Sequence, residues 1–537
     1  MTYRPRISSI AYSTGKNTYP NFSNGVSNGF NEEKRSISNS KTSLTEDAGD
    51  GRFENGVFIK NHGLNWFVTG LFLVGDLAGG GLVALPTATI QLGIYPGVII
   101  GVIMNIIFMF TAYMLGVSWN ILLRRWSEYR SHCRKPYPEI AYRALGPVCR
   151  LLVSICIDVT QFGIAVVYLL LSAKNIHDAI KSFSDTNISF CFVVLIVAVC
   201  LMPVLFLKSP QDFWWAVVLA MFTTSAAVVL ILVGSSLDFG TCHKHTAYPD
   251  FKFTNVFLGL GTLLFAYGGH SAFPTIQHDM KIPSQFTRSA ILAFAILFFM
   301  YTPVCILGYY TYGNALRDSV INSLQKDWIQ QAVNLLITIH CILTLTIVFN
   351  PLNQEVEEIF NVPQKFGPKR VIIRTGMMVA VVFVAESVPT FGPLLDLMGG
   401  STLTLTSVVF PALFYIFLVA GEKKANERIA QRGFKTDEDD CPVTLKELVK
   451  YSNPVILGLC GCIIVFGILG GAAATYSAIH ELTSTQFACP CYILPFDSSC
   501  ASSGSDQSTN CCGVNQTIVA HLSDGIKCSA PKLDFYS

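Results

Sequence analysis

The order of apolar and polar positions divides the chain into three parts. Residues 1–62 contain 23 Ser, Asn and Gly residues, and no apolar run among them exceeds three positions. Such a segment buries too little surface to offset its ordering entropy, so we expect a disordered N-terminal arm. From residue 63 to 477 apolar runs alternate with short polar breaks, and residues 478–537 form a polar, cysteine-rich tail.

The apolar runs of the second part are long enough to cross a membrane as helices. A helix needs about 20 apolar residues to cross ~30 Å of hydrocarbon. No early apolar run precedes a small-residue cleavage site, so we expect the first span to be an uncleaved insertion signal. The pattern predicts an all-α integral membrane domain with eleven spans, at residues 64–90, 94–123, 148–181, 188–207, 212–234, 255–278, 286–312, 328–358, 370–388, 393–419 and 453–477.

Composition agrees with a multi-spanning membrane protein. Apolar residues make up 51% of the chain and charged residues 13%, which is about half the usual charged share. The net charge of +2 implies no nucleic-acid partner. No phosphate loop, nucleophile motif or metal-ligand cluster occurs, so we expect no enzyme, no ATP-driven pump, no cofactor and no metal.

Basic residues predict the orientation in the membrane. With the N-terminus inside, the inner segments hold 29 of the 37 Lys and Arg residues. This bias favours a cytoplasmic N-terminus, and eleven spans then place the tail outside or in a lumen. The sequence does not choose between the plasma membrane and an endolysosomal or vesicular membrane.

Cysteines support an oxidising environment for the tail. Six of the 17 cysteines lie there, and their spacing suits up to three disulfides rather than a zinc site: Cys489, Cys491, Cys500, Cys511, Cys512 and Cys528. Cys242, in an outer loop, is a further pairing candidate, and we interpret the cysteines inside helices as small apolar fillers. Asn515 begins a glycan acceptor sequence, which also indicates an outer location.

Two predicted helices contain interruptions in the middle of the membrane. The first has the run Gly79-Gly80-Gly81 followed by Pro86, and the sixth has Gly268-Gly269 followed by Pro274. Glycine has low helix propensity and proline removes a helical hydrogen bond, so both helices should unwind there. Unpaired backbone at that depth is tolerated where it lines a cavity or is buried in protein.

The positions of these breaks predict an inverted repeat. Spans one to five and six to ten form two halves, each opened by a broken helix, and one extra helix follows. Because five is odd, the second half inserts in the opposite orientation, as in secondary transporters whose substrate site lies where both breaks meet. Exposed amides can hold a carboxylate and exposed carbonyls an ammonium group, which suits an amino acid. The alternative is that the glycines only permit close helix packing.

Residues 55–477 resemble the amino acid/auxin permease family. The stretch from Gly75 to Gly93 is similar to its first helix, and Phe265 through Met280 is similar to its sixth. Gly400-Ser401-Thr402 and the following Phe410-Pro411 resemble its tenth helix. The resemblance implies eleven spans, a cytoplasmic N-terminus, and proton- or sodium-coupled transport of amino acids or related solutes. Sodium-coupled members carry an asparagine where this chain has Gly75, with Asp76 beside it, which favours protons.

Polar residues inside the membrane are candidates for substrate and ion binding. Asp76 is costly in hydrocarbon, so it either faces the pathway as a proton site or caps the helix break. His270 either holds the bundle by bonding to the first helix or relays protons. On the third span Asp158, Gln161 and Tyr168 share one face, which either lines the pathway or bonds neighbouring helices. His340, Asn350, Asn353 and Asp396 are further polar candidates.

These observations lead to one main functional hypothesis. The chain is expected to be a secondary active transporter of amino acids or similar solutes, working by alternating access with proton coupling through Asp76, His270 or Asp158. A sodium-coupled transporter and a non-transporting amino acid receptor on the same fold remain as alternatives. The expected partners are the solute, the coupling ion and the lipid bilayer. The expected substrate-binding residues are Asp76, Ala78, Gly79, Gly80, Gly81, Gln161, Tyr168, Tyr267, Gly268 and Gly269.

Overall fold

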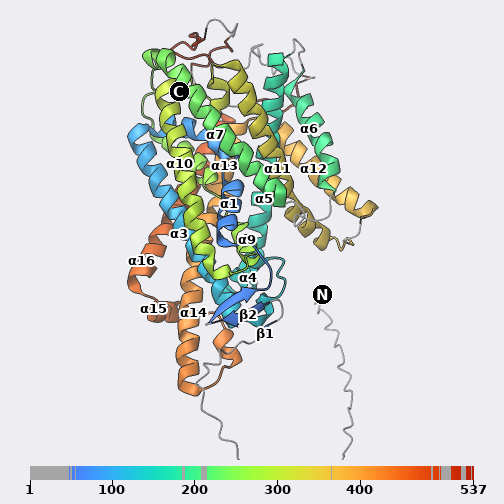
Figure 1. The fold of residues 1–537 in the computed structure, drawn as a ribbon, viewed down its shortest axis with the longest axis vertical. Helices are drawn as coiled ribbons and strands as arrows, with labels where there is room; N and C mark the ends of the chain where they lie inside the picture. Colours follow the sequence, from blue (N-terminus) through green and yellow to red (C-terminus); the bar gives the residue numbers. More distant parts are fainter. Residues whose placement is uncertain are drawn as a thin grey trace, which may run out of the picture. The chain divides into compact units, whose positions relative to one another are not determined.

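The computed structural model describes most of the chain from residue 47 onward. The described residues are 47, 48, 51–54, 56–183, 188–206, 214–363, 366–484, 488–494, 496, 509–521, 528–533, 535 and 536. All of them belong to the unit formed by residues 44–537. Helices dominate this unit (Figure 1).

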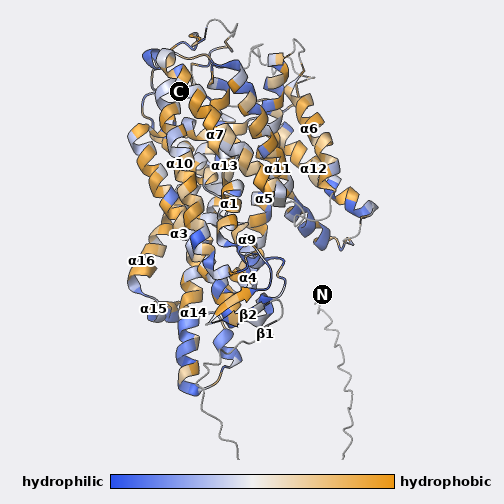
Figure 2. Ribbon diagram, in the orientation of Figure 1, coloured by the Kyte–Doolittle hydropathy of each residue, from blue (hydrophilic) through white to orange (hydrophobic). Residues whose placement is uncertain are grey.

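The helices run between two faces that we name by what they carry. The arm face carries the strands β1–β3, α4 (Pro136–Leu145) and α15 (Leu445–Tyr451), and the tail face carries residues 509–521 (Figure 1). Figure 2 shows mainly apolar residues along the middle of the helices and polar ones at the arm-face end of α14. This distribution is that of helices whose middle sections contact lipid or one another.

The first half begins with a broken helix. α1 ends before the glycine run and α2 starts within it, and the pair is bent by 61°. The remaining helices of this half each run without a break. In chain order the half consists of α1 (Trp66–Leu77), α2 (Gly80–Leu92), α3 (Ile94–Arg125), α5 (Pro147–Phe183), α6 (Phe190–Leu205) and α7 (Trp214–Cys242).

The second half repeats this plan. Its first helix is interrupted over residues 267–272, and its last contains π-helical turns at Gly399–Leu403 and Leu405–Val409. The helices are α8 (Phe253–Ala266), α9 (Phe273–His278), α10 (Phe286–Tyr312), α11 (Asp327–Ile359), α12 (Pro368–Ser387), α13 (Phe391–Met398) and α14 (Phe410–Arg432), followed by α16 (Pro454–Thr483).

The predicted fold class is confirmed in its main features, an all-α membrane protein with broken first and sixth helices. Each predicted span coincides with a helix or helix pair. Within the described part of the chain, seven helices are long and apolar enough to cross a membrane, and the bent pair α1–α2 makes eight. α6 and α8 are shorter apolar helices, so the count of eleven crossings stays a prediction.

The interruption near Gly399 was not expected. Ser401 has non-helical angles, φ −90° and ψ −116°. An added Cβ at Gly399 would lie 2.1 Å from the carbonyl oxygen of Gly261 on α8, and one at Gly400 would lie 2.8 Å from the backbone nitrogen of Thr475 on α16. The glycines therefore allow three helix backbones to meet closely.

Part of the predicted disordered arm is folded. Strands β1 (Asp47–Ala48), β2 (Gly51–Glu54) and β3 (Val57–Lys60) form an antiparallel sheet. The Lys60 amide donates to the carbonyl of Lys281 at 2.9 Å, and Phe58 is buried. The prediction of disorder is wrong for these strands because backbone pairing to the segment after α9 compensates for their low apolar content. Residues 1–46 lie outside the described residues.

Disulfides join the tail to the helices. Cys191 on α6 pairs with Cys491, Cys242 on α7 pairs with Cys512, and Cys511 pairs with Cys528. Cys489 is also disulfide-bonded, and Cys500 lies outside the described residues. Cys191 was interpreted as an apolar filler, and that interpretation is wrong because the α6 end brings it beside the tail. Glu386, Cys191 and Cys491 lie close enough together to bind a metal ion, but the two sulfurs form a disulfide with each other.

Candidate functional site

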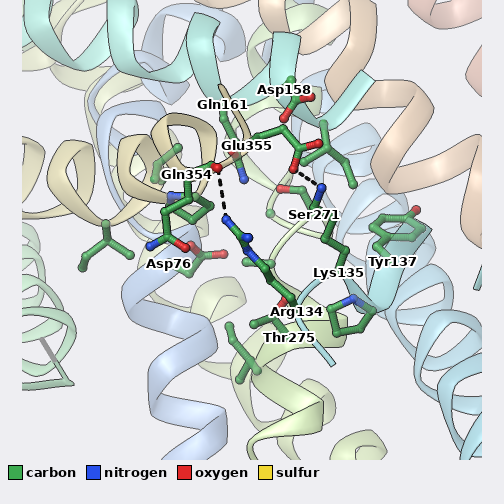
Figure 3. A pocket seen from close by; sticks show the side chains of 18 of the residues that line it. Asp76, Arg134, Lys135, Tyr137, Asp158, Gln161, Ser271, Thr275, Gln354 and Glu355 are labelled. Atoms are coloured by element: carbon green, nitrogen blue, oxygen red, sulfur yellow. Dashed lines mark hydrogen bonds and ion pairs between the residues drawn. The ribbon is translucent and has the colours of Figure 1, made fainter. Parts of the chain in front are cut away.

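A cavity of about 1120 Å³ leads from the helix breaks toward the arm face. Its inner end is formed by Asp76, Gly268 and Gly269, and its mouth by residues 132–138 and the arm-face end of α11. Figure 3 shows side chains from these segments pointing into the same space. The volume is slightly above the range of about 300–1,000 Å³ that is typical of small-molecule sites, so the cavity has room for an amino acid.

Asp76 lies at the inner end of this cavity, in the last turn of α1. Its Oδ2 is buried and has no hydrogen-bond partner among the described residues. An added Cβ on Gly269 would lie only 2.8 Å from that oxygen, so the carboxyl group faces the second helix break. An unpaired carboxyl oxygen at this depth is costly unless the group is protonated or binds a ligand.

The three glycines of the first break do not line the cavity. An added Cβ on Gly80 would lie 2.8 Å from the ring of Tyr168. An added Cβ on Gly79 would lie 2.2 Å from Nε2 of His340. Gly79 and Gly80 are thus covered by α5 and α11 in this conformation. Gly81 packs against Ala266 of α8, and Ala78 is buried with them.

The second break contributes its glycines directly to the cavity. Gly268 and Gly269 are in the lining, whereas Tyr267 is buried beside it. The hydroxyl of Tyr301 on α10 lies 3.1 Å from both the Leu77 and Ala266 carbonyl oxygens, toward which it donates. These carbonyls belong to the last turn of α1 and of α8. Tyr301 therefore joins both breaks, and sequence reasoning missed it because α10 carries no interruption.

One face of α5 follows the cavity wall, as its polar spacing predicted. Asp158, Gln161 and Tyr168 all line the cavity. Figure 3 shows Asp158 and Gln161 on the α5 side, near Glu355 of α11. Asp158 makes no ion pair among the described residues. The α5 wall of the cavity therefore carries a carboxyl group of its own.

His270 lies outside the cavity and contacts α3 in this conformation. It is fully buried and absent from the cavity lining. Its Nε2 lies 3.0 Å from the Thr111 hydroxyl and 3.0 Å from the Phe108 carbonyl. Its partners are on α3 and not on the first helix, so the expected bond to that helix is not present.

Ion pairs cross the mouth of the cavity. Lys135 Nζ lies 2.5 Å from Glu355, and the Arg134 guanidinium donates to the Gln354 carbonyl at 3.0 Å (Figure 3). Lys135 Nζ also lies 3.1 Å from Glu358. These contacts connect the segment before α4 to the end of α11. Burial raises the pKa of the nearby Cys133 thiol to about 11, so this cysteine stays protonated and unreactive at neutral pH.

A second, smaller hollow lies on the opposite side of the breaks. It measures about 20 Å³ and is lined by α2, α8 and α13. Asp396 is buried in it and accepts a hydrogen bond of 2.5 Å from Thr262. The carboxyl groups of Asp318 and Glu481 and the ring of Phe535 also line it. A space of this size holds about one water molecule.

The predicted site residues thus fall into two groups. The structure brings Asp76, Asp158, Gln161, Tyr168, Gly268 and Gly269 together around the cavity. The remaining predicted residues lie outside its lining, namely Ala78, Gly79, Gly80, Gly81, Tyr267 and His270.

Comparisons with known proteins give a consistent result. Residues 62–436 match the family described as transmembrane amino acid transporter protein. The Arabidopsis thaliana amino acid transporter AVT1J is 24% identical over 374 residues, which cover 68% of this chain and 83% of that protein. Lysine histidine transporter-like 4, also from Arabidopsis thaliana, is 26% identical over 378 residues, or 66% of this chain and 81% of that protein.

Two solved structures are similar to this chain at lower sequence identity. A manganese transporter mutant from Eremococcus coleocola is 15% identical, with a TM-score of 0.44 over 78% of this chain and 94% of that chain. A Na⁺-coupled sialic acid symporter is 11% identical, with a TM-score of 0.41 over 78% of this chain and 90% of that chain.

Proposed function

Because the chain belongs to the transmembrane amino acid transporter family, we propose that it carries an amino acid or a similar solute by proton-coupled alternating access. One observation supports this proposal most directly. Both helix breaks meet at the inner end of a cavity that reaches the arm face, while their other sides enclose a hollow of only about 20 Å³. A solute path open at one face and closed at the other is one state of an alternating-access cycle.

In the proposed cycle the solute binds between the two breaks. The Gly268–Gly269 backbone and the last carbonyls of α1 and α8 receive its amino group, since helix C-terminal carbonyls attract cations. The amides of Gly79, Gly80 and Gly81 receive its carboxylate once Tyr168 and His340 move away from them. Tyr168 and His340 thus cover the carboxylate site in the empty, arm-side-open state of this proposal.

The coupled proton binds to Asp76 in this proposal. Its Oδ2 is buried at the inner end of the cavity without a partner among the described residues, so a bound proton removes an uncompensated charge. Asp158, on the α5 wall of the cavity, is a second position for the proton on its way to the arm face. The arm face is then the cytoplasmic side, in the plasma membrane or in an endolysosomal or vesicular membrane.

Uptake into proteoliposomes tests this function. A panel of labelled amino acids that includes lysine and histidine is offered at two pH values, with and without sodium. We expect saturable uptake of at least one solute that rises with an inward proton gradient and does not need sodium. Saturable binding without net flux would instead identify a receptor, and accumulation driven by sodium at constant pH would identify a sodium-coupled transporter.

A further inference from the structure

The end of the tail is packed onto the tail-face ends of the broken helices. Tyr536 is buried, with an exposed fraction of 8%. Its hydroxyl donates to the Leu316 carbonyl at 3.1 Å, and its own carbonyl accepts from the Asn255 amide at 3.4 Å. Asn255 lies in the first turn of α8, so the last residues of the tail hold the start of a broken helix.

Arg317 fixes this contact from the loop after α10. Its guanidinium donates to the Lys532 carbonyl at 2.5 Å and stacks 4.8 Å from the centre of the Phe535 ring. The backbone carbonyl of Arg317 accepts a hydrogen bond from the Thr87 hydroxyl on α2. One loop residue therefore connects the tail end to α2, the outer part of the other broken helix.

Beneath this contact lies the small hollow between α2, α8 and α13. Phe535 is part of its lining, together with Thr87, Gln91, Leu258 and Asp396. The hollow and the large cavity lie on opposite sides of the helix breaks. In the proposed transport, a solute that enters from the tail face reaches the breaks along the outer parts of α2 and α8, where Phe535 lines the hollow and Tyr536 contacts α8.

Covalent and polar contacts anchor the rest of the tail nearby. Cys242 bonds to Cys512 and Cys511 to Cys528, so the segment that carries Lys532 is linked to the end of α7. Asp238 on α7 accepts from His521 at 2.9 Å. These anchors keep the tail end close to its contact surface even when the contact itself breaks, which raises its effective concentration there.

We propose that Phe535 and Tyr536 form a plug on the transport path, which has to leave the ends of α2 and α8 before the site opens to the tail face. The tail then sets the balance between the arm-side-open and tail-side-open states. The inference rests on the proposed function only where it concerns the rate of transport. Whether Phe535 and Tyr536 block the way from the tail face to α2 can be measured separately.

Access to α2 can be measured without transport. Gln91→Cys places a thiol in the hollow, and the Gln91 side chain oxygen has no partner among the described residues, so the change removes no hydrogen bond of that oxygen. A membrane-impermeant maleimide is added from the tail face to the full chain in proteoliposomes. The rate of labelling is corrected for the same chain without Gln91→Cys. We compare the intact tail with Tyr536→Phe and with Phe535→Ala combined with Tyr536→Ala.

Tyr536→Phe should speed labelling about fivefold, the change expected when one hydrogen bond of about 1 kcal/mol is lost. The double variant should speed it further. The control Leu533→Ala, at a tail residue that is 65% exposed, should leave the rate unchanged. Equal rates in Tyr536→Phe and the intact chain would overturn the proposal, and this variant keeps the ring, so it also decides the matter if the double variant does not fold.

The labelling result is independent of the proposed function. Faster labelling in a chain that shows no uptake supports the plug and contradicts transport. Normal uptake with unchanged labelling supports transport and contradicts the plug.

Discussion

Asp76 combines burial with the absence of a partner among the described residues, and this sets its expected behaviour as the proton site. Asp76→Asn keeps the shape of the side chain but cannot gain or lose a proton. We expect it to retain exchange of labelled for unlabelled solute and to lose pH-driven accumulation. One proton moved across 100 mV contributes about 2.3 kcal/mol, or about 50-fold in accumulation, and this factor should disappear.

The matched control is Asp250→Asn, in the exposed loop before α8. It should transport like the unchanged protein. Unchanged accumulation in Asp76→Asn would remove Asp76 from the coupling mechanism.

Tyr301 offers a second test, of the carbonyl pair that it joins. Tyr301→Phe leaves the Leu77 and Ala266 carbonyls without this donor, which should lower stability by about 1–3 kcal/mol. A bound amino group can donate to the same carbonyls. We therefore expect a transported amino acid to raise the melting temperature more in Tyr301→Phe than in the unchanged protein, as measured by thermal denaturation in detergent.

Tyr476→Phe serves as the comparison, because Tyr476 is 72% exposed on α16. It should change neither quantity. An equal rise in both proteins would mean that the carbonyl pair does not bind the amino group.

The close contact between α2 and α8 depends on the glycine at position 81, which has no side chain. An added Cβ on Gly81 would lie 2.7 Å from Cα of Ala266, which is backbone and cannot rotate away. We expect Gly81→Ala to separate the two broken helices and abolish uptake. Gly101→Ala on α3, where nothing lies within 4 Å, should leave uptake unchanged. Normal uptake in Gly81→Ala would contradict the close packing of the breaks.

A buried ion pair holds α11 to α12. Arg374 Nε lies 2.6 Å from Glu357, and Arg370 Nε lies 3.2 Å from the same carboxylate. Removing one partner leaves a buried charge uncompensated, so Glu357→Gln should destabilise the protein by about 3–5 kcal/mol. The neighbouring Glu358 is 53% exposed, and Glu358→Gln should cost about 0–1 kcal/mol. Similar melting temperatures for Glu357→Gln and Glu358→Gln would contradict the larger stabilising role of the buried ion pair.

Local signals predicted the helices well, and tertiary contacts account for what was missed. Glycine and proline act on their own backbone, so the breaks at Gly80 and Gly268 could be located from the sequence. The break near Gly399 was not predicted, and the close approach of Gly399 to the backbone of Gly261 on another helix is a tertiary contact that local patterns do not show. The covering of Gly79 by His340 depends on how α11 is rotated, and the pattern of apolar residues does not fix that rotation. Asp158, Gln161 and Tyr168 were found because helical spacing alone places them on one face.

The placement of the tail on one face of the membrane has a direct test. Asn515 is exposed and lies in the described part of the tail. We expect a glycan there, so glycosidase should shift the mobility of the protein on a gel, and Asn515→Gln should abolish the shift. A shift that persists in Asn515→Gln, or modification of the tail cysteines by a thiol reagent without prior reduction, would contradict an outer, oxidised tail.

The disulfides that bind the tail to α6 and α7 also impose an order on biosynthesis. Their partners are 300 and 270 residues apart. At about 5–20 residues per second, a ribosome needs about 15–60 s to make 300 residues. During that time Cys191 and Cys242 lack their disulfide partners, in what the proposed topology makes an oxidising compartment. The disulfides to α6 and α7 can therefore form only after α16 has been made, and a chain that stops before Cys512 leaves Cys242 without its disulfide partner.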